Sequence, residues 1–206
     1  MPRFLIFARH GETLDNARGV TQGWGDSALS GTGQIQAKAL GCRLAAAELH
    51  AIYASPLLRA VTTAQAVAGR SGHEVKQLDD LREMNCGRWE GVPFLQIRDH
   101  EEEIYRAWVN DPAYPCPEGE SLVDVHVRIE RAIETMLDEN PDPESTVLVV
   151  SHGTAIRIAA AALLDLPIAA ARGFMQDNTA INVFERRGKR FLLRTWNDTS
   201  HLNGDA

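Results

Sequence analysis

The sequence predicts an α/β fold, a three-layer sandwich with a mostly parallel open sheet, helices on both faces and a small inserted cap. Continuous apolar runs at residues 4–8 and 147–150 are typical of buried parallel strands. Each run stops at a histidine followed by glycine, and a helical pattern comes next. Because α/β proteins bind ligands at the carboxyl ends of their strands, we expect His10 and His152 to meet at one rim of the sheet.

The first half of the chain predicts three strands joined by crossover helices. Strands are expected at residues 3–8, 51–54 and, more weakly, 74–77. The glycine- and serine-rich stretch 11–30 is predicted to be a long loop, which is usually a functional feature. Ser30 is a suitable N-cap for a helix reaching about residue 50. Ser55-Pro56 opens the next helix, over 57–70, because proline suits a first helical turn.

The second half predicts the cap and the rest of the sheet. Residues 79–91 are irregular, 93–109 have a helical pattern, and the three prolines of 111–120 require a loop. We therefore interpret 79–120 as a cap over the sheet rim, within one domain spanning 1–206. The remaining elements are a helix capped by Ser121 and ended by Asn140-Pro141, a strand at 146–150, a helix at 154–164 and a hairpin of 181–185 with 191–196.

Composition narrows the class of protein. The 206 residues carry a formal net charge of -7, which argues against nucleic acid or an anionic membrane as a partner. Three cysteines without a CxxC pair argue against a disulfide framework and a zinc site. The chain has no apolar run long enough for a signal peptide or a membrane span, so we expect a cytoplasmic enzyme.

The residues at the predicted rim suit an anionic ligand. Neutral histidine can form covalent intermediates, so His10 is a candidate nucleophile. Arg9 beside it, and Arg59 in the first turn of the helix after the second strand, bring guanidinium groups that recognise phosphate. With His152 they form a cationic pocket in an acidic protein. Glu83 is the best-placed candidate for the acid that would protonate a leaving oxygen.

These residues belong to a longer series of motifs that resembles the histidine phosphatase superfamily, in the branch with phosphoglycerate mutases, α-ribazole phosphatases and fructose-2,6-bisphosphatases. The match covers almost the whole chain in order. Its motifs are Arg9-His10-Gly11-Glu12-Thr13, Asn16, Gln22-Gly23, Ser55-Pro56-Leu57 with Arg59, Glu83, Trp89-Glu90-Gly91, Gly119-Glu120-Ser121 and Ser151-His152-Gly153.

The resemblance implies roles for individual residues. His10 would become phosphohistidine, Arg9, Arg59 and His152 would hold the phosphoryl group, and Glu83 would act first as acid and then as base. The residues implied in substrate binding are Gly11, Glu12, Thr13, Asn16, Gln22, Gly23, Cys86 and Gly153. The expected substrate is a small phosphomonoester, hydrolysed without metal or bound cofactor. Dimers are common in the family, so a homodimer is an open expectation, as is a pocket contact by His201.

Two other functions remain as alternatives. A phosphoglycerate mutase would need cationic cap groups for the second charged end of its substrate, and the sequence has Asn85-Cys86 and Val92-Pro93-Phe94 where the mutases carry tyrosine and lysine. The stretch 83–120 contains only Arg88, Arg98 and Arg106 as cations. A non-catalytic protein that binds phosphorylated ligands would be favoured by loss of a catalytic residue, and none is lost here.

Overall fold

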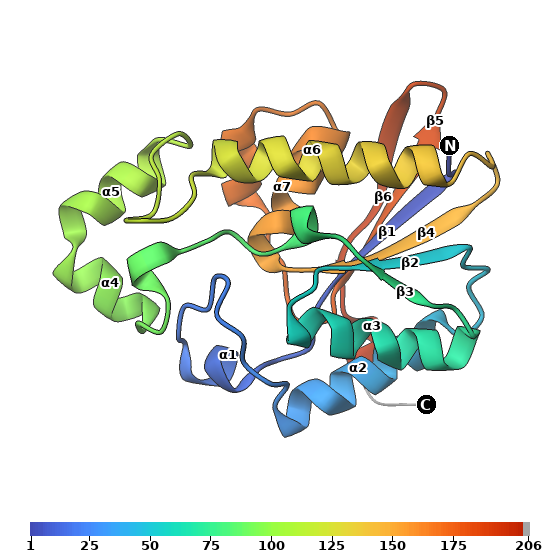
Figure 1. Ribbon diagram of the computed structural model, residues 1–206, viewed down its shortest axis with the longest axis horizontal. Helices are drawn as coiled ribbons and strands as arrows, with labels where there is room; N and C mark the ends of the chain where they lie inside the picture. The colour runs from blue at the N-terminus through green and yellow to red at the C-terminus, as the bar shows by residue number, and fades with distance from the viewer. Residues whose placement is uncertain (204–206) are drawn as a thin grey trace.

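A computed structural model describes residues 1–203 and contains a single six-stranded sheet of order β3-β2-β4-β1-β5-β6 (Figure 1). The four strands β1 to β4 are parallel, whereas β5 and β6 are antiparallel to their neighbours. The strand bounds are β1 Phe4–Arg9, β2 Ala51–Ala54, β3 Val75–Gln77, β4 Thr146–Ser151, β5 Ile181–Arg187 and β6 Arg190–Asp198. The mostly parallel open sheet expected from the sequence is confirmed.

Helices cover both faces of this sheet. Figure 1 shows α6 and α7 on one side and α2 and α3 on the other. The helix bounds are α1 Leu14–Arg18, α2 Gly31–Leu44, α3 Leu58–Ser71, α4 Phe94–His100, α5 Glu102–Asn110, α6 Leu122–Glu139 and α7 Gly153–Leu163. Single turns of 3-10 helix lie at Asp79–Leu81, Gly87–Trp89 and Ser200–Leu202, and a longer one at Ile168–Gly173.

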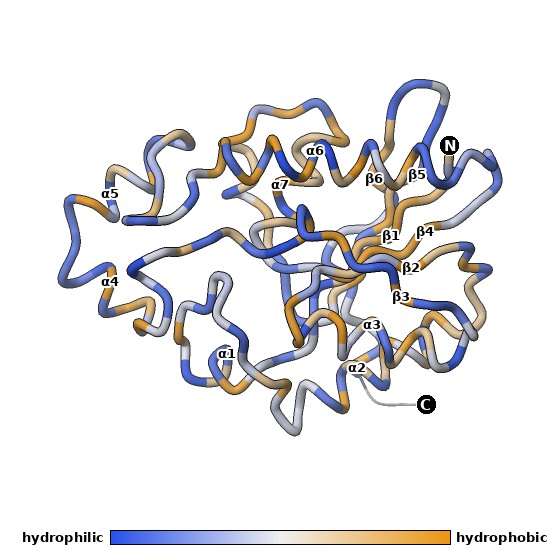
Figure 2. Tube along the Cα trace, in the orientation of Figure 1, coloured by the Kyte–Doolittle hydropathy of each residue, from blue (hydrophilic) through white to orange (hydrophobic). Residues whose placement is uncertain are grey.

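Successive side chains of β1 point to opposite faces of the sheet and pack into two separate hydrophobic cores. Leu5 and Phe7 pack with the α6 and α7 side, while Ile6 and Ala8 pack with α2 and α3. All four are buried, as a strand covered on both faces requires. In Figure 2 the strands β1, β2 and β4 are largely orange, which places the apolar residues between the two helical layers.

Helix caps were well predicted, but some helix bounds were wrong. Ser30 accepts a hydrogen bond from the Gly33 amide at the start of α2, and Ser121 forms a capping box with Asp124 at the start of α6. However, α2 ends at Leu44 rather than near residue 50, and a following turn leaves Leu49 buried in the core. The expected loop 11–30 contains the short helix α1, which begins at its own capping box.

The cap also differs from the expected single helix over 93–109. It forms two helices, α4 and α5, which are separated at Glu101, where φ is -123° and ψ is 42°. Three further acidic residues, Asp99, Glu102 and Glu103, flank this break, and their mutual repulsion disfavours a continuous helix. Figure 1 shows α4 and α5 beyond the end of the sheet where β1 and β4 finish.

One buried arginine of α6 connects the cap segment to the main fold. Arg128 donates from Nη1 to the carbonyl oxygens of Asp80 (2.9 Å) and Arg82 (2.6 Å), and from Nη2 to that of Glu83 (2.9 Å). Its Nε donates to the Glu120 carboxylate at 2.9 Å. These bonds fix the entry and the exit of the cap. No helix within the described part of the chain is both long and apolar enough to cross a membrane.

Candidate active site

His10 follows the last residue of β1 and is buried, with 3% of its surface exposed. Its Nδ1 lies 2.8 Å from the Gly11 carbonyl oxygen. A carbonyl group only accepts, so in the neutral ring Nδ1 carries the proton and Nε2 keeps a free lone pair. Burial, with the charges of Arg9 and Arg59, holds the pKa of His10 well below 6.5. The ring is therefore neutral at pH 7, as a nucleophile must be.

His152 lies beside His10 because β1 and β4 are parallel neighbours in the register Arg9↔Ser151. The ring centroids are 5.1 Å apart, so the two imidazoles do meet at one rim. Arg59 Nε donates to His152 Nδ1 at 3.2 Å, which leaves the ring proton on Nε2. Burial, with the charge of Arg59, lowers the pKa of His152 well below 6.5. Its Nε2 is buried and has no hydrogen-bond partner.

The two arginines come from different elements. Arg59, in the first turn of α3, is 1% exposed and donates to the carbonyl oxygens of Gly25 (2.7 Å) and Gly23 (2.8 Å), which holds the loop before α2 in place. Arg9 ends β1 and donates from Nη1 to the Gln176 carbonyl at 2.6 Å. Arg9 Nε is buried without a partner, as is His152 Nε2. Arg9 Nε and His152 Nε2 are thus two unpartnered donors in the sequence-predicted cationic set.

Glu83 presents its carboxylate at the beginning of α7. Oε1 accepts from the Met84 amide (2.8 Å) and Oε2 from the Thr154 amide (3.1 Å). A Cβ added to Gly153 would lie 3.8 Å from both Arg9 Nε and Glu83 Oε2, so this glycine lies between the guanidinium and the carboxylate. The acid and the cationic group are therefore close enough to act on one ligand.

A cavity of about 380 Å³ opens over this rim, a volume suited to a small metabolite. It is lined by Arg9, His10, Arg59 and Glu83 and by four of the predicted binding residues, Asn16, Gln22, Gly23 and Cys86. Its cap side is aromatic and apolar, with Trp89, Phe94, Ile97 and Trp108. Trp24 is not a lining residue and instead donates from Nε1 to the Glu83 carbonyl at 2.8 Å.

Four other predicted binding residues lie outside the lining of the cavity, Gly11, Glu12, Thr13 and Gly153, and so does His152, which was predicted to hold the phosphoryl group. Thr13 donates to the Gln22 side chain at 3.0 Å, and Glu12 accepts from Ser30 at 2.6 Å, so both organise the loop. Gly11 must be glycine because a Cβ there would lie 2.6 Å from the Gly33 carbonyl oxygen. His201 is also outside the cavity, with Nε2 3.2 Å from Thr179 Oγ1.

Thr154 and Arg157 are among the cavity residues that sequence reasoning missed. Both follow His152 within two turns of α7, a spacing that could have placed them at the rim. Cys86 is buried, and its pKa is raised by its neighbour Cys116 and by desolvation, so little thiolate forms at neutral pH. Within residues 1–203, no cluster of three His, Cys, Asp or Glu side chains is arranged to hold a metal ion.

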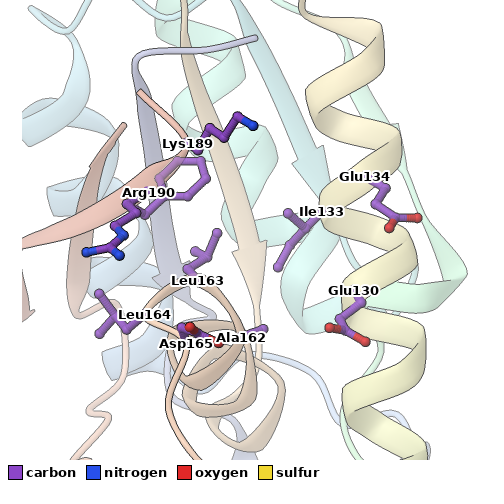
Figure 3. Close-up of a pocket in the computed structure, with 10 residues that line it drawn as sticks. Glu130, Ile133, Glu134, Ala162, Leu163, Leu164, Asp165, Lys189 and Arg190 are labelled. Carbon is purple, nitrogen blue, oxygen red and sulfur yellow. The ribbon is translucent and has the colours of Figure 1, made fainter. Parts of the chain in front are cut away.

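A second hollow, of about 560 Å³, lies at the other end of α7 (Figure 3). Figure 3 shows Glu130 and Glu134 of α6 on one wall and Lys189 and Arg190 of the β5–β6 hairpin on the other. The 11 residues of α7 separate it from His152 by about 16 Å. Its charged lining has mixed sign and includes no predicted catalytic residue. The predicted catalytic residues therefore gather at the His10 cavity and not at this hollow.

Comparison with known proteins agrees with this geometry. The family model of the histidine phosphatase superfamily (branch 1) matches residues 5–199. Phosphoserine phosphatase 1 of Hydrogenobacter thermophilus is 33% identical over 199 residues, covering 96% of this chain and 93% of the relative. A probable phosphoglycerate mutase of Erwinia tasmaniensis is 33% identical over 210 residues, covering 98% and 96%.

Solved structures place the fold in the same group. A mycobacterial glucosyl-3-phosphoglycerate phosphatase, solved in complex with VO3, superposes with a TM-score of 0.90 at 32% identity and covers 96% of this chain and 100% of that one. The family model covers residues 5–199, and the relatives are about one-third identical along nearly their full length. The chain belongs to branch 1 of the histidine phosphatase superfamily and is a phosphatase of phosphorylated metabolites.

Proposed function

We propose that this phosphatase hydrolyses small phosphomonoesters through a phosphohistidine formed on His10, without a metal ion. The observation that carries the proposal is the pair of buried, unpartnered donors, Arg9 Nε and His152 Nε2, beside a neutral His10. Buried donors without partners are costly, and the oxygens of a phosphoryl group would satisfy them. The relatives named above act on phosphoserine and glucosyl-3-phosphoglycerate according to their names, which supports a small metabolite as substrate.

In the first step, His10 Nε2 attacks phosphorus and the ester P–O bond breaks. Glu83, in its acid form, gives its proton to the leaving alkoxide. Arg9, Arg59 and the His152 Nε2–H group bind the phosphoryl oxygens while charge builds up on them. The Gly11 carbonyl keeps the His10 Nδ1 proton in place, so that the ring attacks through Nε2.

In the second step, the Glu83 carboxylate takes a proton from water, and the water oxygen attacks phosphorus. The P–N bond breaks, His10 returns to its neutral form and inorganic phosphate leaves. The hydrogen bonds from the Met84 and Thr154 amides hold the carboxylate on the cavity side throughout. Two arginines in the same pocket would repel a divalent cation, so the proposed steps use protein groups alone.

Trapping the intermediate tests this proposal. Brief reaction with a 32P-labelled monoester, followed by a denaturing quench, should give label that is stable in alkali and lost in acid, mapped to His10. His10→Ala should abolish both labelling and turnover, whereas His100→Ala, an exposed cap histidine, should preserve both. Label on a serine or an aspartate would overturn the mechanism.

A further inference from the structure

A smaller cavity, of about 200 Å³, adjoins the catalytic one on its cap side. Trp108, Thr154 and Arg157 line both cavities, so the two lie side by side and share these side chains. Arg172, from the 3-10 helix Ile168–Gly173, lines the smaller cavity but not the catalytic one. Arg172 also stacks over the Trp108 ring at 4.5 Å. The smaller cavity is thus bounded by two guanidinium groups.

These guanidinium groups have only neutral partners. Arg157 donates from Nε to the Gly153 carbonyl (3.1 Å) and from Nη2 to Thr154 Oγ1 (3.2 Å). Arg172 donates from Nη2 to the Trp108 carbonyl, and its Nε is buried with no partner. Across residues 1–203, neither side chain has a carboxylate oxygen within 4.0 Å.

The two positive charges also act on each other. Burial lowers the pKa of Arg172, and the charge of Arg157 lowers it further. Keeping two like charges together in a half-buried cavity costs free energy unless an anion joins them. The cap arginines behave differently, because each forms an ion pair with an acidic neighbour: Arg88 with Glu101, Arg98 with Asp99 and Arg106 with Glu102. Arg157 and Arg172 are therefore left available in a protein of net charge -7.

We propose that Arg157 and Arg172 bind a second anionic group of the substrate, so that the substrate is a phosphomonoester bearing a carboxylate or a second phosphate. The inference rests on the proposed function, because the phosphoryl group at His10 fixes the other end of the molecule. The Trp108 indole N–H, buried without a partner, supplies a further donor at the junction of the two cavities. Guanidinium groups match the planar geometry of a carboxylate or a phosphate face.

Matched substrate pairs test the proposal. 3-Phosphoglycerate and glycerol 3-phosphate differ only in a carboxylate, and propane-1,3-diol bisphosphate and its monophosphate differ only in a second phosphate. We expect the wild-type enzyme to favour the member that carries the second anionic group, in at least one pair, by at least about tenfold in kcat/KM, mainly through KM. That factor corresponds to about 1.4 kcal/mol. Whichever pair shows the larger ratio identifies the group as carboxylate or phosphate.

Substitutions test whether the two arginines cause this preference. Arg157→Gln and Arg172→Gln should each lower the ratio at least about tenfold, and Arg172→Lys should retain part of it. Arg106→Gln, on the exposed face of the cap, should leave it unchanged. Thermal unfolding shows whether each variant is folded. If Arg172→Gln is not folded, Arg172→Lys, which keeps the positive charge, is assayed in its place.

The outcomes separate this inference from the function it rests on. A wild-type ratio near one in both pairs, with p-nitrophenyl phosphate hydrolysed normally, would overturn the second anion site alone. The same conclusion would follow if both glutamine variants lost activity equally on both members of each pair. Failure to hydrolyse any monoester, p-nitrophenyl phosphate included, would overturn the proposed function and this inference with it.

Discussion

Arg59 Nε donates a hydrogen bond to His152 Nδ1, and this contact joins the first turn of α3 to the end of β4. It determines which nitrogen of His152 carries the proton, because arginine can only donate. The same guanidinium holds the Gly23 and Gly25 carbonyls of the loop that lines the cavity. Arg59 therefore organises the site as well as contributing charge to it.

Arg59→Ala should reduce kcat by roughly 10²–10³-fold, the usual loss for one preorganised charge-stabilising group. The loss has two physical causes, removal of positive charge and release of the His152 ring. Steady-state hydrolysis of p-nitrophenyl phosphate measures it. Arg70→Ala, an exposed arginine of the same helix, is the matched control and should behave as wild type. A change of less than about threefold for Arg59→Ala would place this side chain outside the chemistry.

Glu83→Gln should affect esters according to their leaving groups. Alkoxides need a proton from Glu83, whereas p-nitrophenolate leaves readily without one, so the loss in the first step should be greater by about 10² for an alkyl phosphate. Comparing glycerol 3-phosphate with p-nitrophenyl phosphate under single-turnover conditions measures this difference. Glu134→Gln, in the remote hollow at the other end of α7, should leave both rates unchanged. Equal losses on the two esters would remove Glu83 from the role of acid.

The buried histidines should make stability depend on pH. His10 and His152 have pKa values lowered well below 6.5 in the folded state, chiefly by burial. Above pH 6.5 each is neutral whether folded or unfolded. As the pH falls below 6.5 the unfolded chain binds protons that the folded chain does not, so stability decreases by about 1.4 kcal/mol per histidine for each pH unit.

Denaturant unfolding between pH 7.5 and 5.5 measures this decrease. The slope of the unfolding free energy against pH should be smaller in His10→Asn than in wild type, because one of the two groups is removed. His100→Asn should keep the wild-type slope, since that residue is exposed. An unchanged slope in His10→Asn would show that the imidazole is protonated alike in the folded and unfolded chains.

Much of the fold was predictable because it depends on local sequence patterns. Apolar runs fixed β1 and β4 to within a residue at most ends, and serine caps located the starts of α2 and α6. Parallel pairing of β1 with β4 then brings His10 beside His152. The break at Glu101 was not predicted, because a helical pattern continues across it in the sequence.

The cap side of the cavity was the part that sequence reasoning could not supply. Arg157 and Arg172 lie outside the cap segment, on α7 and on a 3-10 helix that has no periodic pattern. Their approach to Trp108 depends on residues of α5, of the start of α7 and of this 3-10 helix lining one cavity, a long-range arrangement. A count of cap cations in 83–120 therefore missed Arg157 and Arg172, which line the smaller cavity from outside that stretch.

Chelation should leave activity intact. The candidate site contains two histidines with two arginines and one carboxylate, a set that disfavours a divalent cation. Dialysis against EDTA, followed by assay with p-nitrophenyl phosphate in metal-free buffer, should retain at least about 90% of the rate, since none of the proposed chemical steps uses a metal. A loss that Mg²⁺, Mn²⁺ or Zn²⁺ restores would contradict the metal-independent mechanism.

Hydrolysis should prevail over mutase chemistry, although the relatives include probable phosphoglycerate mutases. Both reactions begin with transfer of the phosphoryl group to His10. A mutase must then retain phosphoglycerate, reorient it and keep water from the phosphohistidine. The three cap arginines that could help are paired with Glu101, Asp99 and Glu102, so they are not free to hold a reorienting substrate.

Arg157 and Arg172 do not change this expectation, because both line the smaller cavity and would hold the second anion there, whereas a mutase must let its substrate reorient. Water can then reach the phosphohistidine, with Glu83 as base. With 3-phosphoglycerate as substrate, phosphate release should exceed formation of 2-phosphoglycerate by at least about tenfold, which needs only ~1.4 kcal/mol of barrier difference. Phosphate assay and 31P NMR of the same reaction measure the two products. Rapid interconversion with little free phosphate would favour the mutase instead.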